Sequence, residues 1–575
     1  MFNKKYTRVL LFLPGVAMLV FAVVVSSDSY ARFLLGENAK DLAWGPALFR
    51  VLLAFHGALL ITVSLVWERF SSTKKNAHES SPKERMSAAI WIALAFLCVV
   101  SLGLRMWYLN TDLWVDELLT LLDFSRQPMG QILTSFPNQN QHMLFSILSH
   151  ASIETFGESA WALRLPSVLF GVASVFVFFF FCRRFVSVRE SLLSCALMTV
   201  SYHHIWFSQN ARGYMGLLLF TLLATWCWFE ALENNKWRWW LGYVMSVVLG
   251  MWIHSTMAFV VASQGLLYLT LLAFPGLGGQ RTEDSPERRA GLRPWAAWAI
   301  SITATMQLYA LALPEFLAVG LHEESKDSEW TNIFWVLSES LRGLSFGFAG
   351  LAVVLGGGVF VAFGWLSLFK RSRRLAVLMV LPAILAGTTM LLLGHNLWPR
   401  FFFFSMGFGL LIIVHGATEL PAFLASFVAS LKDRPQITAL AGVALTVLII
   451  LASLFSAQRN YALPKQDFSG AKNYIESQSL PGDRVIVVSL ASLFYNRYMA
   501  LPWQVAKSRS DLEDFQGTSD RTWLIYTLPI EVKAFRPDLW QVIERDYNVE
   551  KVFPGTLHGG EIFVCQRRMI KEESE

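Results

Sequence analysis

Long apolar runs separated by short polar stretches fill the chain from its start to about residue 457. A helix needs about 20 apolar residues to cross the hydrocarbon core of a bilayer. Thirteen runs come close to that length, near residues 7–26, 46–67, 87–107, 165–182, 190–208, 212–232, 238–254, 256–274, 295–313, 350–369, 375–394, 400–417 and 437–456. The pattern predicts a mostly α fold, a polytopic transmembrane helical bundle of about 13 spans.

Two apolar segments need a separate interpretation. The stretch Leu144 to Phe156 carries His150 and Glu154, so it predicts an interfacial or re-entrant helix rather than a span. The first run follows a basic start, as a signal peptide would, but no clear small-residue cleavage site comes after it. We interpret it as a retained first helix.

Charged residues between the runs alternate in sign. Basic loops lie at 69–85, 183–189, 281–293 and 370–374, and acidic loops lie at 112–123 and 315–329. By the positive-inside rule the basic loops face the cytoplasm. With an odd number of spans, this predicts a cytoplasmic N-terminus and an extracytoplasmic C-terminus in a bacterial cytoplasmic (inner) membrane.

The composition narrows the class of protein further. Only 16% of the 575 residues are charged, against about 25% in soluble domains, and 54% are hydrophobic. The net charge of +6 comes from short loops between apolar runs, so we expect membrane lipids, and no nucleic acid, as partners. Five cysteines without a CxxC pair support neither a cysteine zinc site nor a disulfide framework.

The composition changes after Ala457. A helix start at 467–475, a Pro-Gly turn at 481–484 and apolar strands at 485–488, 523–526 and 562–565 predict a small soluble α/β domain. We therefore divide the chain into two N-terminal helices with a basic cytoplasmic loop (1–86), a transmembrane catalytic domain with outer loops at 108–160 and 314–332 (87–457), and an extracytoplasmic domain (458–575).

The first outer loop carries adjacent carboxylates, Asp116 and Glu117. Adjacent carboxylates repel each other, and partial burial raises at least one pKa, which is how a general base is tuned. A base at the membrane surface could deprotonate an acceptor beside a lipid-linked donor. On spacing alone, a solvated acidic loop that obeys the orientation rule is equally well supported.

A polar cluster, Asn138-Gln139-Asn140-Gln141-His142, opens the interfacial helix. His142 could contact a metal, a phosphate or a sugar hydroxyl. Taken alone, the cluster is better explained as an ordinary polar helix start capped by asparagine.

Arginines interrupt the apolar runs at the outer membrane face. Arg212 lies between two runs and Arg400 precedes another. A guanidinium there needs a partner or must snorkel to the interface, and a phosphate is a natural partner for its planar donors. Arg164 and His254 fall at the same level, where each alone is better explained as structural.

These motifs occur in an order that resembles a known family. The Asp-Glu pair, the His-containing stretch, "LRLPSVLFGVASVFVFFFFCRRF", "SQNARGYMGLLLF" and "WPRFFFF" follow one another as in GT-C glycosyltransferases of the protein O-mannosyltransferase and aminoarabinose transferase type. The resemblance covers about 107–409, and the serial order is more specific than any single motif.

The resemblance implies an inverting transfer from a polyprenyl-phosphate-linked sugar, by a hexosyl- or pentosyltransferase of the cell envelope. It implies that Asp116 is the catalytic base, supported by Glu117, and that Arg212 and Arg400 bind the donor phosphate. Substrate-pocket residues would be His142, Gln209, Tyr214 and His254. The acceptor would be a glycan, a lipid or a protein.

This chain departs from the family pattern in three places. The usual His-Pro-Pro is His142-Met143-Leu144, Arg400 is followed by Phe401 rather than tyrosine, and two extra spans precede the Asp-Glu loop. Asp116, Glu117 and His142 are suitable ligand types for a divalent metal ion, but their spacing is not diagnostic. The sequence therefore leaves metal dependence open.

Other functions fit the apolar runs as well. A polytopic transporter or lipid flippase predicts related halves and ionisable residues at mid-bilayer, whereas the chain has no visible internal repeat and its ionisable residues cluster at one face. A non-catalytic lipid-binding scaffold would not require Asp116, Arg212 and Arg400. The glycosyltransferase is the interpretation that accounts for all three.

Overall fold

The computed structural model describes residues 4–36, 42–71, 86–278, 285–322, 334, 350–428, 430, 434–516 and 521–568. The predicted basic residues at 74–85 and 281 and the predicted acidic residues at 323–329 lie outside this part of the chain. The described chain forms two compact units that each combine several segments. The first joins Met1–Phe96, Gln127–Ile147 and Phe220–Glu323, and the second joins Leu97–Arg126, Leu148–Leu219 and Glu324–Glu575.

The predicted polytopic helical fold is confirmed. Each of the thirteen apolar runs coincides with helix. Among the described residues, seven helices are long and apolar enough to cross a membrane, or nine if each of two bent pairs is one span. The runs at 238–254 and 256–274 form helices of 17 residues each, and the run at 190–208 breaks at Ser201, whose ψ of 125° is extended. The chain is an integral membrane protein.

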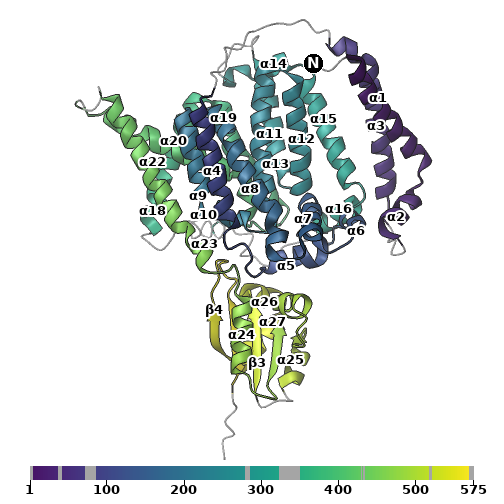
Figure 1. The fold of residues 1–575 in the computed structure, drawn as a ribbon, viewed down its shortest axis with the longest axis vertical. Helices are drawn as coiled ribbons and strands as arrows, with labels where there is room; N and C mark the ends of the chain where they lie inside the picture. The colour runs from purple at the N-terminus through teal and green to yellow at the C-terminus, as the bar shows by residue number, and fades with distance from the viewer. Residues whose placement is uncertain are drawn as a thin grey trace, which may run out of the picture. The chain divides into compact units, whose positions relative to one another are not determined.

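In the described part of the first unit, the regular elements are all helices (Figure 1). Its helices are α1 (Lys4–Val24), α2 (Ser27–Leu35), α3 (Gly45–Ser71), α6 (Met129–Thr134), α12 (Trp237–Ile253), α13 (Met257–Ala273), α14 (Pro286–Ala290), α15 (Arg293–Tyr309) and α16 (Leu313–His322). Helices α1 and α3 pack closely because both carry glycine at the contact. A Cβ on Gly15 would lie 2.8 Å from the carbonyl oxygen of Gly57.

The second unit combines apolar helices with the loop that holds the predicted base. Its elements before residue 463 are α5 (Val115–Leu119), the π-helical turn η2 (Thr120–Ser125), α8 (Ala160–Arg183), α9 (Val188–Val200), α10 (Tyr202–Ser208), α18 (Gly350–Arg371), α19 (Arg373–Leu392), the 3₁₀ turn η4 (Pro399–Ser405), α20 (Met406–Ala425), α22 (Pro435–Ala457) and α23 (Arg459–Ala462). Three further helices, α4 (Ala88–Met106), α7 (Met143–Phe156) and α11 (Tyr214–Asn234), cross the division between the units.

Helices α18, α20 and α22 pack through small residues, as apolar helices in a membrane do. A Cβ on Gly364 would overlap the carbonyl oxygen of Ile412, and one on Gly416 would overlap that of Phe360. Gly442 meets the backbone of Thr418 in the same way. These contacts fix α20, which continues directly from the turn that carries Arg400.

The predicted C-terminal α/β domain is confirmed. Its elements are α24 (Phe468–Gln478), β1 (Arg484–Val488), η5 (Leu493–Tyr498), β2 (Gln504–Ala506), α25 (Arg509–Gln516), β3 (Thr522–Thr527), α26 (Pro529–Phe535), α27 (Pro537–Asp546), β4 (Tyr547–Phe553) and β5 (Ile562–Arg567). The sheet order is β2-β1-β3-β5-β4, with β1 parallel to both neighbours and β5 antiparallel to both of its own.

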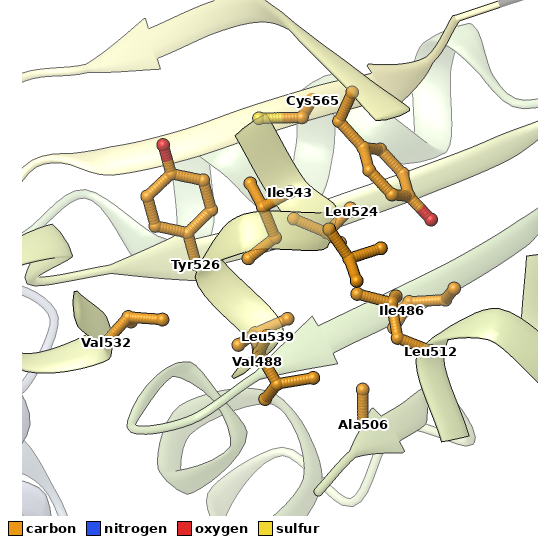
Figure 2. Close-up of a cluster of buried hydrophobic side chains, with 12 residues drawn as sticks. Ile486, Val488, Ala506, Leu512, Leu524, Tyr526, Val532, Leu539, Ile543 and Cys565 are labelled. Carbon is orange, nitrogen blue, oxygen red and sulfur yellow. The ribbon is translucent and has the colours of Figure 1, made fainter. Parts of the chain in front are cut away.

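The core of this domain lies between one face of the sheet and the helices α25, α26 and α27 (Figure 2). Ile486 and Leu524, from the central strands, are fully buried against Leu539 of α27. The edge strand β4 was not predicted. Its five middle residues are exposed, and its polar sequence gives no apolar run.

Replacing Gly416 with alanine is expected to destabilise the protein, because the added methyl group overlaps Phe360 and overpacking costs about 1–3 kcal/mol. The matched control is Gly409→Ala on the same helix, where no neighbouring atom lies within 4 Å. Thermal unfolding of both variants in detergent should show a lower Tm for Gly416→Ala alone. Equal Tm values would contradict the close packing of α18 on α20.

Candidate functional site

The predicted catalytic loop begins where α4 ends and turns into the short helix α5. Trp114 directly precedes α5. The backbone N–H of Trp114 donates a hydrogen bond to the Glu117 carboxylate at 3.3 Å. Carboxylates in a first helical turn are also favoured by the helix dipole. This cap directs Glu117 back into the protein and leaves Asp116 to face elsewhere, so the adjacent carboxylates have different environments.

Glu117 is fully buried and forms a two-pronged ion pair with Arg164 of α8. The carboxylate oxygens accept from Arg164 Nη2 at 2.6 Å and from Nε at 2.8 Å, and the backbone N–H of Ala211 donates at 2.7 Å. Arg164 also donates to the loop carbonyls of Leu109 and Asp112. Glu117 and Arg164 together tie the loop to α8.

The electrostatics make Glu117 an anchor rather than a base. Burial raises the pKa of this carboxyl, but the charges of Arg164 and Lys465, with the hydrogen bonds from Arg164 and the Ala211 backbone, outweigh burial and hold the pKa below its usual range. The sequence-based expectation of a raised pKa is therefore not met at Glu117. Removing one partner of a buried pair typically costs about 3–5 kcal/mol, so the pair maintains the conformation of the loop.

Asp116 faces the second predicted arginine. Its Oδ2 lies 3.3 Å from Arg400 Nη1 in η4. The Arg400 guanidinium packs over the indole of Trp398 at 5.0 Å and of Trp114 at 6.0 Å, while about a quarter of the side chain stays exposed. Asp116 Oδ2 and Arg400 Nε are buried without a hydrogen-bond partner in the described part of the chain. Such atoms are expected where a ligand binds.

Arg212 reaches the same loop one helical turn further on. Its Nη1 donates to the Thr120 hydroxyl at 3.2 Å, and that hydroxyl donates to the Asp116 carbonyl at 2.9 Å. The Arg212 carbonyl is held by the Ser167 hydroxyl of α8 at 2.9 Å. The structure thus brings Asp116 together with Arg400 directly and with Arg212 through Thr120.

Aromatic packing joins the two segments that carry the arginines. The Phe207 ring, at the end of α10, lies 5.3 Å from Tyr214 and 4.2 Å from Phe403 of η4. Tyr214 itself is buried, with the Arg212 guanidinium 5.9 Å from its ring. The predicted pocket residue Tyr214 therefore lies between the two predicted phosphate-binding segments.

The other predicted pocket residues are placed differently. The Gln209 amide donates to the backbone carbonyls of Arg105 and Trp107, so its contacts are structural. His142 and His254 both belong to the first compact unit, where their buried rings lie 4.6 Å apart. Their predicted role in binding substrate stays a prediction.

Sequence reasoning missed a segment that we call the strap, residues 465–469. Gln466 is fully buried; its Oε1 accepts from the Val115 N–H at 2.9 Å, while its amide donates to Thr527 and Gly560 of the sheet domain. Ser469 donates to both oxygens of Asp112. The strap therefore fastens the predicted catalytic loop to the C-terminal domain. Only its polar residues directly after the last span could have indicated this contact.

Lys465 of the strap is buried beside Glu117. Its ammonium lies 3.8 Å from Glu117 Oε1 and donates to the Gln209 carbonyl. Burial, together with the nearby Arg164 charge and against the attraction of Glu117, lowers its pKa from 10.5 to about 7. The lysine therefore changes charge close to neutral pH.

A metal site at the Asp-Glu pair receives no support from this geometry, because both carboxylates oppose guanidinium groups. Within the described ranges, the group with metal-ligand proximity consists of Glu190, His415 and Glu419. Glu190 Oε1 there accepts from His415 at 2.8 Å and from Thr418 at 3.0 Å. These hydrogen bonds explain why the three groups lie close together without a metal ion. Whether the protein depends on a metal stays open.

The Lys465 titration gives the protein a pH-dependent stability. The unfolded lysine titrates near 10.5, so between about pH 7 and pH 10 the folded protein binds fewer protons and its stability rises with pH. Thermal unfolding from about pH 6.5 to about pH 8.5 should show a rising Tm in the wild type and a flatter profile in Lys465→Met. The control Lys472→Met, on the surface of α24, should keep the wild-type slope; a flattened slope there would refute the assignment.

Comparison with known proteins finds one protein family whose model matches a segment of this chain. The segment includes residues of both compact units. Residues 142–276 match the model of the family described as dolichyl-phosphate-mannose-protein mannosyltransferase. The matched segment contains Arg212, Tyr214 and the two pocket histidines, whereas Asp116 and Arg400 lie outside it. Among curated proteins, no sequence matches the chain significantly.

Solved structures give remote likenesses. ArnT from Cupriavidus metallidurans bound to undecaprenyl phosphate is 12% identical, with a TM-score of 0.48, over 84% of this chain and 99% of that one. The Archaeoglobus fulgidus oligosaccharyltransferase tethered to an acceptor peptide is 10% identical, with a TM-score of 0.42, over 83% and 74%. Arabinosyltransferase EmbB from Mycobacterium smegmatis is 12% identical, with a TM-score of 0.42, over 72% and 45%.

Because these TM-scores lie below 0.5, the assignments of individual residues rest on this chain alone. The family match, by contrast, confirms over residues 142–276 the resemblance that the order of motifs predicted. It favours a membrane glycosyltransferase that uses a lipid-linked sugar, and it does not favour the transporter alternative.

Proposed function

We propose that this protein is an inverting glycosyltransferase that moves a sugar from a polyprenyl-phosphate-linked donor to an acceptor on the extracytoplasmic side of the membrane. The observation that carries the proposal is the 3.3 Å approach of the Asp116 carboxylate to the Arg400 guanidinium, with Arg212 bound to Thr120 one helical turn further along the Asp116 segment. A base and two cations in one compact unit are the groups that this reaction requires. The family match to residues 142–276 supports the same class of reaction.

In the proposed mechanism Asp116 accepts a proton from the acceptor hydroxyl or amine. The acceptor attacks the anomeric carbon from the face opposite the phosphate, and the bond between that carbon and the phosphate oxygen breaks. Polyprenyl phosphate leaves with the bonding electrons, and Arg400 and Arg212 neutralise the charge that develops on it. One new glycosidic bond forms, with inverted configuration.

The Asp116–Arg400 pair implies an order of binding. Without donor, the two side chains serve as counterions for each other across 3.3 Å. The phosphodiester of the donor offers Arg400 another anion with two free acceptor oxygens, so it competes with Asp116 for the guanidinium. Donor binding would then release the carboxylate to receive the proton of the acceptor.

The topology completes the proposal. Alternation of basic and acidic loops supports an inner-membrane location with the N-terminus in the cytoplasm and residues 458–575 outside. We propose the division at residues 86 and 457 on the same grounds, with the two N-terminal helices preceding the catalytic part. The strap, which links the sheet domain to the catalytic loop, supports a domain that works on the same side as the base.

Replacing Asp116 with asparagine should reduce transfer by about 10²–10⁴-fold, the usual contribution of a general base, while leaving the fold intact. The matched control is Asp123→Asn in the same loop, whose carboxylate pairs with the half-exposed Arg497 at 2.7 Å. Transfer would be measured from a radiolabelled polyprenyl-phosphate sugar in membranes that contain each full-length variant. Near-normal transfer by Asp116→Asn would remove this residue from the proposed role.

Replacing Arg400 with alanine should weaken donor binding, because the side chain is only 27% exposed and truncating one partner of a buried charge pair costs about 2–5 kcal/mol. Binding of undecaprenyl phosphate to the purified protein would be followed by native mass spectrometry or calorimetry. The surface variant Arg497→Ala should bind as the wild type does. An unchanged affinity in Arg400→Ala would contradict the phosphate assignment.

A further inference from the structure

A cavity of about 740 Å³ opens beside the loop that carries Asp116, and neither Asp116 nor the two arginines lines it. Its walls come from the end of α4 with the following loop, from the start of α8, and from the chain that leads into the strap. All of these segments belong to the second compact unit. The volume lies within the range of about 300–1,000 Å³ that is typical of small-ligand sites.

The polar part of the cavity consists mainly of hydrogen-bond acceptors. Asp112, Asp467 and Asn110 line it, and among the described residues no lysine, arginine or histidine does. Two carboxylates without a facing cation repel a phosphate or another anion. This composition separates the cavity from the proposed donor site, which is built around arginines.

The carboxylates are already compensated by groups of the protein. Both oxygens of Asp112 accept from Ser469 at 2.7 Å, and Asp467 accepts from the Gly470 N–H at 2.9 Å. Arg164 donates to the Asp112 backbone carbonyl at 2.8 Å. These donors occupy only part of the carboxylate lone pairs, and the remaining lone pairs can accept hydrogen bonds from neutral hydroxyl groups.

Aromatic side chains supply the apolar part of the cavity. The Trp161 ring is braced by Phe156 at 5.6 Å. Tyr108, half exposed, has a φ of +60°, a conformation that a bulky residue adopts only where its surroundings impose it. Both residues carry rings with flat apolar faces, and both line the cavity with Asp112 and Asn110.

We propose that this cavity binds a neutral sugar unit of the acceptor, so that the acceptor is a glycan. A pyranose ring has an apolar C–H face, which fits Trp161 and Tyr108, and a rim of hydroxyl donors, which fits the acceptors of Asp112 and Asn110. The inference rests on the proposed glycosyltransferase function, because it names the acceptor class for the Asp116 site. Asp112 precedes Asp116 by four residues in the chain, so the proposed sugar site and the proposed base belong to the same segment.

The test is saturation-transfer NMR on the full-length protein in nanodiscs. The probes are a panel of neutral disaccharides built from glucose, galactose, mannose or N-acetylglucosamine, and a Lys-Ala-Lys peptide. We expect a saturation-transfer NMR signal from at least one disaccharide. Its binding should be about tenfold weaker in Trp161→Ala and partly restored in Trp161→Phe. Trp107→Ala is the matched control, because Trp107 is 70% exposed and does not line the cavity.

Three results would overturn the inference. No disaccharide gives a saturation-transfer signal, only the peptide gives one, or Trp107→Ala weakens disaccharide binding as much as Trp161→Ala does. The readout is independent of catalysis, so the two proposals can fail separately. Disaccharide binding together with normal glycosyl transfer by Asp116→Asn would refute the proposed mechanism but not the sugar site. Loss of glycosyl transfer in Asp116→Asn without any disaccharide binding would refute the sugar site alone.

Discussion

The buried ion pair between Glu117 and Arg164 is the interaction on which the rest of the site depends. It fixes the start of α5 against α8 through two hydrogen bonds of 2.6 and 2.8 Å. Because Glu117 is turned inward, its neighbour Asp116 is turned toward Arg400. Desolvating both charges is expensive, and the additional donors and acceptors around the pair offset that cost. One carboxylate maintains the conformation of the loop so that the other is available for chemistry.

The C-terminal domain takes part in the same constraint. Gln466 binds the backbone at Val115, directly before the Asp-Glu pair, and the same side chain reaches two residues of the sheet domain. Ser469 donates to Asp112, which lies four residues before Asp116. The loop is thus fixed from two sides, by a membrane helix and by the strap. A change in the domain can therefore alter the position of Asp116 without touching the substrate.

Local patterns in the sequence predicted much of this structure. Apolar runs located the helices, and apolar strand patterns located three of the five strands, whereas the exposed strand β4 has no apolar pattern to detect. The helix break at Ser201 was also missed, because the run around it stays apolar. Arg212 and Arg400 stood out because charges next to apolar runs need an explanation.

Contacts between distant residues account for what could not be predicted. In the sequence, Glu117 looks like a second carboxylate available for chemistry. Its structural role becomes visible only with Arg164, 47 residues away, bound to it. Lys465 and Gln466 look like linker residues, since no periodicity relates them to a loop some 350 positions earlier in the chain. The cavity beside Asp112 likewise gathers three segments that are far apart in sequence.

The most direct test of the account is an experimental structure of the full-length protein with undecaprenyl phosphate bound. The account predicts the phosphate at the Arg400 guanidinium, within reach of Arg212, with the Asp116 carboxylate released from Arg400 and facing the space where the anomeric carbon of a donor would lie. A phosphate bound elsewhere, with the Asp116–Arg400 pair intact, would contradict it.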